Sequence, residues 1–123
     1  SARDFDEARD WGFKVIQAEE IWHKSLLPLG ETIKNDLRHS PVYISFDIDS
    51  LDPAYAPGTG TPEIGGLTTP QAIELIRSLS GLNIVGCDLV EVSPPYDPSG
   101  NTALTAANIL YEMLCILPNV ESK

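Results

Sequence analysis

Short β-type runs and longer runs with helical spacing alternate along the chain. β-branched and aromatic residues concentrate in the runs typical of strands, and these are residues 12–17, 42–48 and 82–90. Apolar residues recur every three or four positions in the runs typical of helices. These are residues 19–38, with an interruption near Pro28 and Gly30, 70–79 and 101–117. The pattern predicts strands and helices in alternation.

Residues at the helix ends support two of these predictions. Thr69 suits the N-cap of the helix at 70–79, Pro70 suits its first turn, and Gly81 follows its end. The helix at 101–117 is followed by a proline and is apolar nearly all round. A helix of that kind is buried in the interior and not merely laid on a surface.

Near-continuous apolar strands that alternate with helices are typical of a parallel sheet covered on both faces. We therefore predict an α/β fold with three layers, α/β/α, and a mainly parallel sheet. In open sheets of this kind, ligands bind beyond the carboxyl ends of the strands. Two loops rich in Gly and Pro follow strands, at residues 50–66 and 93–100, and a functional site is expected there.

Length, composition and charge narrow the range of functions. The 123 residues suit one domain, and 42% apolar with 21% charged residues is ordinary for a globular protein. A net charge of −10 argues against nucleic acid or an anionic membrane as partner, and favours a cationic ligand or a metal ion. Cys87 and Cys115 lie in apolar segments, so we interpret them as buried thiols of a reducing compartment.

Two aspartates at the end of the strand at 42–48 are the strongest candidates for chemistry. Asp47 and Asp49 point to the same side of an extended chain, with Cα atoms about 6.6 Å apart, so their carboxylates can converge on cations. Two metal ions about 3.5–4 Å apart fit that span. A calcium loop that starts at Asp47 is excluded, because it needs an acid where Gly58 stands. A magnesium-dependent phosphatase with Asp47 as nucleophile is an alternative.

A longer stretch around these aspartates is more specific. Residues 45–67, SFDIDSLDPAYAPGTGTPEIGGL, closely resemble the signature of the ureohydrolase family, which includes arginases and agmatinases. Residues 88–94, DLVEVSP, resemble a later motif of the same family, and residues 101–103 also match. Residues 94–97 and 111–114 are more similar to the agmatinase branch than to the arginase branch. The resemblance implies the carboxyl-terminal part of an arginase-like fold.

The resemblance implies roles for four residues of this sequence. Asp47 matches the carboxylate that bridges two manganese ions, and Asp49 matches a carboxylate that chelates one of them. Glu91 matches the acid that pairs with the substrate guanidinium, and Thr61 matches a threonine that lines the same pocket. On the residues alone, a surface acid at a strand end is the alternative for Glu91, and a turn residue is the alternative for Thr61. Asp52 is expected to form a turn.

The activity that the resemblance implies is hydrolysis of a guanidino compound by a hydroxide that bridges two Mn²⁺ ions. Agmatine, cleaved to putrescine and urea, is the expected substrate. Guanidinobutyrate, guanidinopropionate, arginine and formiminoglutamate are left open. The expected partners are this small cationic substrate and, in a complete enzyme, further copies of the chain in a trimer or hexamer. The expected location is the cytoplasm, or the mitochondrion in a eukaryote.

The metal site of the family is only partly represented in this sequence. Four of the six ligands, two His and two Asp, come from motifs that precede the Asp-x-Asp strand in the family and have no counterpart here. His23 and His39 match no ligand position. Residues 1–123 are therefore predicted to be the carboxyl-terminal portion of a single ureohydrolase domain, inactive alone. A non-catalytic truncated subunit that binds full-length partners is the alternative.

Overall fold

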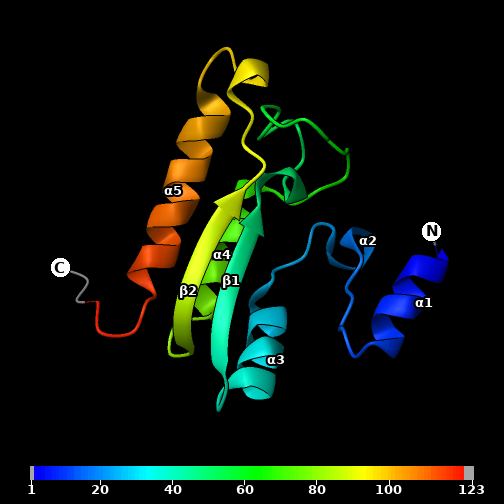
Figure 1. Cartoon of the computed structure of the whole chain (residues 1–123), viewed down its shortest axis with the longest axis vertical. Coiled ribbons are helices and arrows are strands. Elements are labelled where there is room, and N and C mark those ends of the chain that lie inside the picture. Colours follow the sequence, from blue (N-terminus) through cyan, green and yellow to red (C-terminus); the bar gives the residue numbers. More distant parts are fainter. Residues whose placement is uncertain (1, 121–123) are drawn as a thin grey trace.

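The computed structural model describes residues 2–120 (Figure 1). Within them the chain forms five α-helices and two β-strands. Their bounds in chain order are α1 Ala2–Asp10, α2 Ala18–Ile21, α3 Leu27–Leu37, β1 Pro41–Asp47, α4 Thr69–Ser78, β2 Asn83–Val90 and α5 Asn101–Cys115. Each strand is followed by a short 3-10 turn, and these are η1 Ile48–Ser50 and η2 Pro94–Tyr96.

β1 and β2 lie side by side as a parallel pair, so the predicted α/β fold is confirmed (Figure 1). The register pairs Asp47 with Val90 at the end of both strands. The chain passes from one strand to the other through α4, as parallel strands require a crossover. Both strands therefore end at the same edge, where the segments 48–67 and 91–100 begin.

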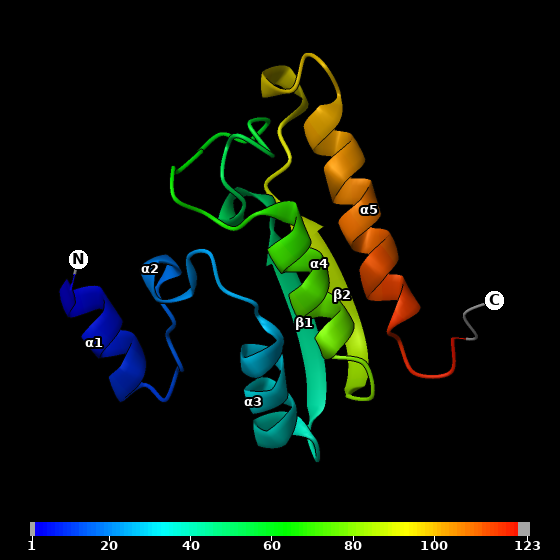
Figure 2. The ribbon, with the colours of Figure 1, turned by 180° about the vertical axis from the view of Figure 1, so that it is seen from behind.

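α4 covers one face of the strand pair, and α3 and α5 lie on either side of it (Figure 2). Apolar side chains from both strands, α4 and α5 form one core on that face. Its buried members are Val42, Ile48, Leu51, Ala56, Ala72, Ile76, Leu79, Leu82, Ile84, Ala106, Ile109, Met113 and Ile116. Ile48 is completely buried directly after β1, so the core fixes the path of the chain at the carboxyl end of that strand.

The predicted helix at 70–79 is α4, although its cap lies one residue earlier than expected. Thr68 is the N-cap in place of Thr69: its Oγ1 accepts a hydrogen bond from Gln71 N at 3.2 Å. Gln71 Oε1 in turn accepts from Thr68 N at 3.1 Å. This reciprocal capping box satisfies two backbone N–H groups that the first turn would otherwise leave unpaired.

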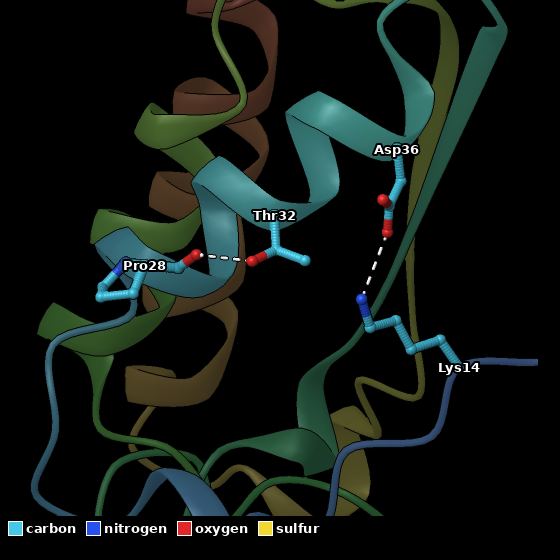
Figure 3. A network of polar contacts seen from close by, with 4 residues as sticks. All are labelled: Lys14, Pro28, Thr32 and Asp36. Atoms are coloured by element: carbon cyan, nitrogen blue, oxygen red, sulfur yellow. Dashed lines mark hydrogen bonds and ion pairs between the residues drawn. The ribbon is translucent and has the colours of Figure 1, made fainter.

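The predicted strand at 12–17 is wrong. These residues form an irregular connection after α1 and pair with no strand in the part of the chain that is described. Lys14 instead forms an ion pair of 3.2 Å with Asp36 of α3 (Figure 3). A strand needs a neighbour to satisfy its backbone groups, so a β-type composition was not sufficient. The apolar pattern also gave no indication of α1.

The helical stretch predicted before β1 is two helices, α2 and α3, separated by residues 22–26. Pro28 lies in the first turn of α3 and does not interrupt it, because the missing N–H of proline is not needed there. Thr32 Oγ1 donates to the Pro28 carbonyl at 3.0 Å (Figure 3). Gly30 is buried where α3 meets α4, so closely that a Cβ would overlap α4.

α5 is buried on one side only. Ala106 and Met113 lie in the core, whereas Leu104, Tyr111 and Leu114 are 63%, 65% and 51% exposed. The prediction of burial on all sides is therefore wrong for this structure, because α4 and β2 pack against one side of the helix.

The two cysteines, Cys87 and Cys115, are free thiols as predicted, and both are half-buried, not fully buried. Across residues 2–120, no helix combines the length and apolar character needed to cross a membrane.

Candidate active site

Two carboxylates meet at the carboxyl end of β1. Asp47 is the last residue of β1, and Asp49 lies in the 3-10 turn that follows. The backbone N–H of Asp49 donates to Asp47 Oδ1 at 3.1 Å. Ile48, between them, is completely buried. Because the Ile48 side chain is anchored in the core, the backbone at this point is fixed. The Asp47 and Asp49 side chains on either side of it are half-buried and remain accessible.

Thr61 joins this pair from the far end of the loop. Its Oγ1 donates to Asp49 Oδ2 at 2.8 Å, across twelve residues of sequence. The loop is closed at its base by two backbone hydrogen bonds of 2.9 Å, from Leu67 N to Ser50 O and from Asp52 N to Leu67 O. The structure thus brings three of the four predicted site residues into one hydrogen-bonded cluster.

Asp52 forms a turn, as expected. Its Oδ1 accepts from Ala54 N at 2.8 Å and its Oδ2 accepts from Gly65 N at 2.9 Å. These N–H donors, that of Ala54 first, lower the pKa of the Asp52 carboxyl and keep it ionised. Asp52 therefore shapes the loop and does not belong to the Asp47–Asp49 cluster.

Glu91, the fourth predicted site residue, directly follows β2. Its backbone has a φ of 70°, in the left-handed region that residues with a side chain rarely adopt. The Glu91 side chain is exposed. Left-handed residues other than glycine concentrate at functional sites, where the surrounding structure maintains the strain. The conformation of Glu91 is a signal that the sequence did not show.

The acidic cluster is electrostatically unfavourable without a cation. Burial raises the pKa of the Asp47 carboxyl, and the negative charges of Asp49 and Glu91 raise it further. The hydrogen bond from Asp49 N opposes this and lowers the pKa of Asp47. Glu91 lies near Asp47 because Val90, the residue before it, pairs with Asp47 in the register of the two strands. A cation between these groups would relieve the repulsion.

These residues fit part of a metal site. Carboxylate oxygens are suitable ligands for Mg²⁺ and Mn²⁺, and Asp47 and Asp49 provide them. Within residues 2–120, however, no group of three or more His, Cys, Asp and Glu side chains could hold an ion. His39 precedes β1 at the opposite end of the strand, and His23 lies in the turn after α2.

The second loop is tied to the first by contacts that the sequence analysis missed. Ser93 N donates to Gly58 O at 2.8 Å, and Gly58 N donates to the buried hydroxyl of Thr102 at 2.9 Å. Asp97 accepts from Thr102 N at 3.0 Å and from Ala103 N at 2.9 Å, which caps the start of α5. These donors, that of Ala103 first, lower the pKa of Asp97. An Asp shortly before a helix is the signal that could have found this cap.

A second polar cluster precedes Asp47 on the same face of β1. Ser45 is opposite Asp88 of β2, and Ser45 Oγ donates to Asp88 Oδ1 at 2.7 Å. Tyr43 Oη donates to Asp88 Oδ2 at 2.8 Å. These hydrogen bonds lower the pKa of Asp88, with that of Ser45 the larger cause. Asp88 belongs to the motif at residues 88–94, but the motif does not reveal Tyr43 and Ser45 as its partners.

A profile of the arginase family matches residues 1–115, nearly the whole chain. The chain belongs to the arginase family. Two curated members show the extent of the similarity. The guanidinobutyrase of Pseudomonas aeruginosa is 64% identical over 120 residues, which are 98% of this chain and 38% of that protein. The mitochondrial agmatinase of Gallus gallus is 66% identical over 113 residues, which are 92% of this chain and 33% of that protein.

The arginase fold is confirmed by solved structures. Arginase from Bacillus caldovelox superposes with a TM-score of 0.82 at 29% identity, over 92% of this chain and 39% of that one. Proclavaminate amidino hydrolase from Streptomyces clavuligerus superposes with a TM-score of 0.84 at 42% identity, over 89% of this chain and 37% of that one. The chain therefore has an arginase-like α/β fold. It spans about a third of the length of the relatives that it matches.

Proposed function

We propose that this chain is the carboxyl-terminal third of a guanidino hydrolase that uses two manganese ions. The observation that carries the proposal is the cluster of Asp47, Asp49 and Thr61 at the carboxyl end of β1, with Glu91 at the end of the neighbouring strand. Membership of the arginase family supports the reaction class, and the oxygen donors of the cluster suit manganese.

Each residue of the cluster has a distinct task in this proposal. Asp47 and Asp49 hold the metal ions, and the hydrogen bond from Thr61 orients the Asp49 carboxylate. Glu91 binds the planar guanidinium group, which a carboxylate can accept through two parallel hydrogen bonds. When bound, the metal pair lowers the pKa of water so that a nucleophile forms near neutral pH. The products are urea and an amine.

The proposed substrate is a short linear guanidino compound. The expectation of agmatine is supported by the acidic character of the chain, since agmatine is a dication, and by the name of the Gallus gallus relative. The name of the Pseudomonas aeruginosa relative, at similar identity, supports guanidinobutyrate equally. We therefore propose that the substrate is one of these two. Part of the groups that bind its far end is expected in the remainder of the enzyme.

The proposed activity belongs to a complete enzyme that contains residues 1–123. Asp47 and Asp49 alone are too few ligands for two divalent ions, so the other ligands must come from the remaining two-thirds of such an enzyme. The 123-residue chain by itself is therefore expected to be inactive. Assembly of the complete enzyme as a trimer or hexamer is part of the same proposal.

Urea release tests the proposal. The complete enzyme is loaded with manganese and assayed with agmatine, guanidinobutyrate, guanidinopropionate, arginine and formiminoglutamate. We expect urea from agmatine or guanidinobutyrate, and loss of activity when a chelator removes the metal. The 123-residue chain, assayed in parallel, is expected to release none. If the complete enzyme releases no urea from any of these compounds, the proposed function is wrong.

A further inference from the structure

Trp22 holds the loop that carries Thr61 from outside the site. It directly follows α2, and its indole Nε1 donates to the Gly65 carbonyl at 2.7 Å. Gly65 has a left-handed φ of 87°, and a Cβ there would lie 3.1 Å from the Trp22 ring. The indole therefore both packs against the loop and hydrogen-bonds to it, four residues after Thr61.

α4 fixes the position of Trp22 through hydrogen bonds to residues before and after it in the sequence. Gln71 Nε2 donates to the carbonyls of Ile21 and Lys24, both at 3.0 Å, which flank Trp22 in sequence. His23, between them, has a left-handed φ of 57°. The turn after α2 is therefore built in a strained conformation, and the surrounding hydrogen bonds maintain it.

A second anchor fixes the end of this turn. Glu74 of α4 accepts from Ser25 Oγ at 2.6 Å and from Leu26 N at 2.9 Å. These donors, the hydroxyl first, lower the pKa of Glu74, so the carboxylate stays ionised and keeps both bonds. Trp22 thus lies in a segment that is hydrogen-bonded to α4, although its own side chain is 47% exposed. Its indole is fixed more by hydrogen bonding than by burial.

We propose that Trp22 is a positioning residue for the active site, and this inference rests on the proposed function. Its hydrogen bond holds Gly65, whose own N–H is bound by Asp52 in the turn that follows Asp49. Because both the N–H and the carbonyl of Gly65 are hydrogen-bonded, the segment before it is held where the Thr61 hydroxyl contacts Asp49. Without the Trp22 bond the loop remains tethered by Asp52 but gains freedom near Thr61.

A matched pair of substitutions tests this assignment in the complete enzyme. Trp22→Phe keeps an aromatic ring against Gly65 and removes the N–H donor. Trp11→Phe makes the same change at the other tryptophan, which is 73% exposed and lies outside the site. We expect kcat/KM to fall about two- to tenfold in Trp22→Phe, the loss typical of one neutral hydrogen bond. Tm should fall by at most a few degrees, as expected for the loss of one hydrogen bond. Trp11→Phe should match the wild type, and equal kcat/KM in all three proteins overturns the assignment.

A double-mutant cycle distinguishes positioning from a general structural effect. If Trp22 acts through the contact of Thr61 with Asp49, then Trp22→Phe should cause little further loss in a Thr61→Val background. If the loss of kcat/KM in the double variant equals the product of the losses in the two single variants, the two residues act independently and the assignment is wrong.

Hydrogen exchange tests the contact even without turnover. In Trp22→Phe, the amides of residues 59–66 should exchange faster than in the wild type, while those of α4 should not change. Unchanged exchange in the loop overturns the role of Trp22, whatever the enzyme hydrolyses. Absence of urea release from wild-type enzyme, with faster loop exchange in Trp22→Phe, would instead refute the proposed function and leave the contact supported.

Discussion

Thr61 and Asp49 lie twelve residues apart, and the Thr61 hydroxyl donates to Asp49 Oδ2 at 2.8 Å. The bond connects the Gly- and Pro-rich loop to the end of β1 and fixes one acidic side chain beside Asp47. Without it, the Asp49 carboxylate could rotate about its side-chain torsions, and its oxygen atoms would not be held in the cluster with Asp47. A hydroxyl in a loop thereby takes part in the geometry of the Asp47–Asp49 cluster.

Replacing Thr61 tests the importance of this contact. Thr61→Val keeps the shape of the side chain but removes the donor. We expect kcat/KM of the complete enzyme to fall by about tenfold or more, since a hydrogen bond to a charged group is lost. Thr61→Ser retains the hydroxyl and should keep most of the activity. Steady-state urea release from both variants measures the contribution of the hydroxyl. A Thr61→Val variant as active as wild type would contradict the prediction.

Asp47→Asn should remove most of the activity and weaken manganese retention in the complete enzyme. The change preserves size but removes the charge with which Asp47 would bind metal in our proposal. Metal content after gel filtration, measured together with turnover, checks both effects. Glu63→Gln is the control, because Glu63 is an exposed acid on the same loop. Normal manganese stoichiometry together with normal turnover in Asp47→Asn would exclude the metal-bridging role.

Glu91→Gln should lower kcat/KM by about 10- to 150-fold, the effect of losing a charge-assisted hydrogen bond. Manganese content should stay unchanged, because in our proposal Glu91 binds the substrate and not the metal. If the variant loses bound manganese in parallel with its rate, Glu91 is a metal ligand instead. Full activity would mean that Glu91 is only a surface acid.

The backbone at Glu91 allows activity to be separated from stability. Glycine adopts the left-handed region without the strain that a side chain causes. Glu91→Gly should therefore unfold at the same temperature as the wild type or a few degrees higher, while it loses activity as Glu91→Gln does. A clear fall in Tm would show that the Glu91 side chain has a structural role.

The cap at Asp97 predicts a dependence of stability on pH. The hydrogen bonds from Ala103 and Thr102 hold the folded-state pKa of Asp97 below its value of about 3.9 in the unfolded chain. A lowered folded-state pKa stabilises the fold above the unfolded value, and this stabilisation is lost as the pH falls through the folded-state value. Asp97→Ala should therefore have a lower Tm than wild type at pH 7. The gap should narrow below about pH 4, and a constant gap would contradict the prediction.

The sequence was sufficient for the parts of the fold that depend on local pattern. The β-branched run before Asp47 predicted β1, and Pro70 with its neighbours predicted α4 to within about a residue at each end. The Asp47–Asp49 pair was also singled out, but strand alternation was the wrong reason, because β1 ends at Asp47 and Asp49 lies in the 3-10 turn that follows. β1 and α4 depend on residues close together in the chain, where propensity decides the structure.

Features that depend on tertiary contacts were not predicted. The strand expected at 12–17 has no neighbour in the described residues, and pairing cannot be judged from composition. The prediction that α5 is buried on all sides was wrong for a related reason. The sequence of a helix shows which of its faces are apolar but not which elements cover them. The left-handed conformation of Glu91 is invisible in the sequence, because the side chain itself disfavours it.

The attachment of Trp22 to Gly65 has a practical consequence for spectroscopy. The chain contains two tryptophans, and one of them lies against the loop of the candidate site. In the 123-residue chain carrying Trp11→Phe, Trp22 becomes the single indole emitter. Its fluorescence then reports solvent access and hydrogen bonding at Gly65, without any attached dye. Opening of the loop would be recorded by an optical signal that the protein itself supplies.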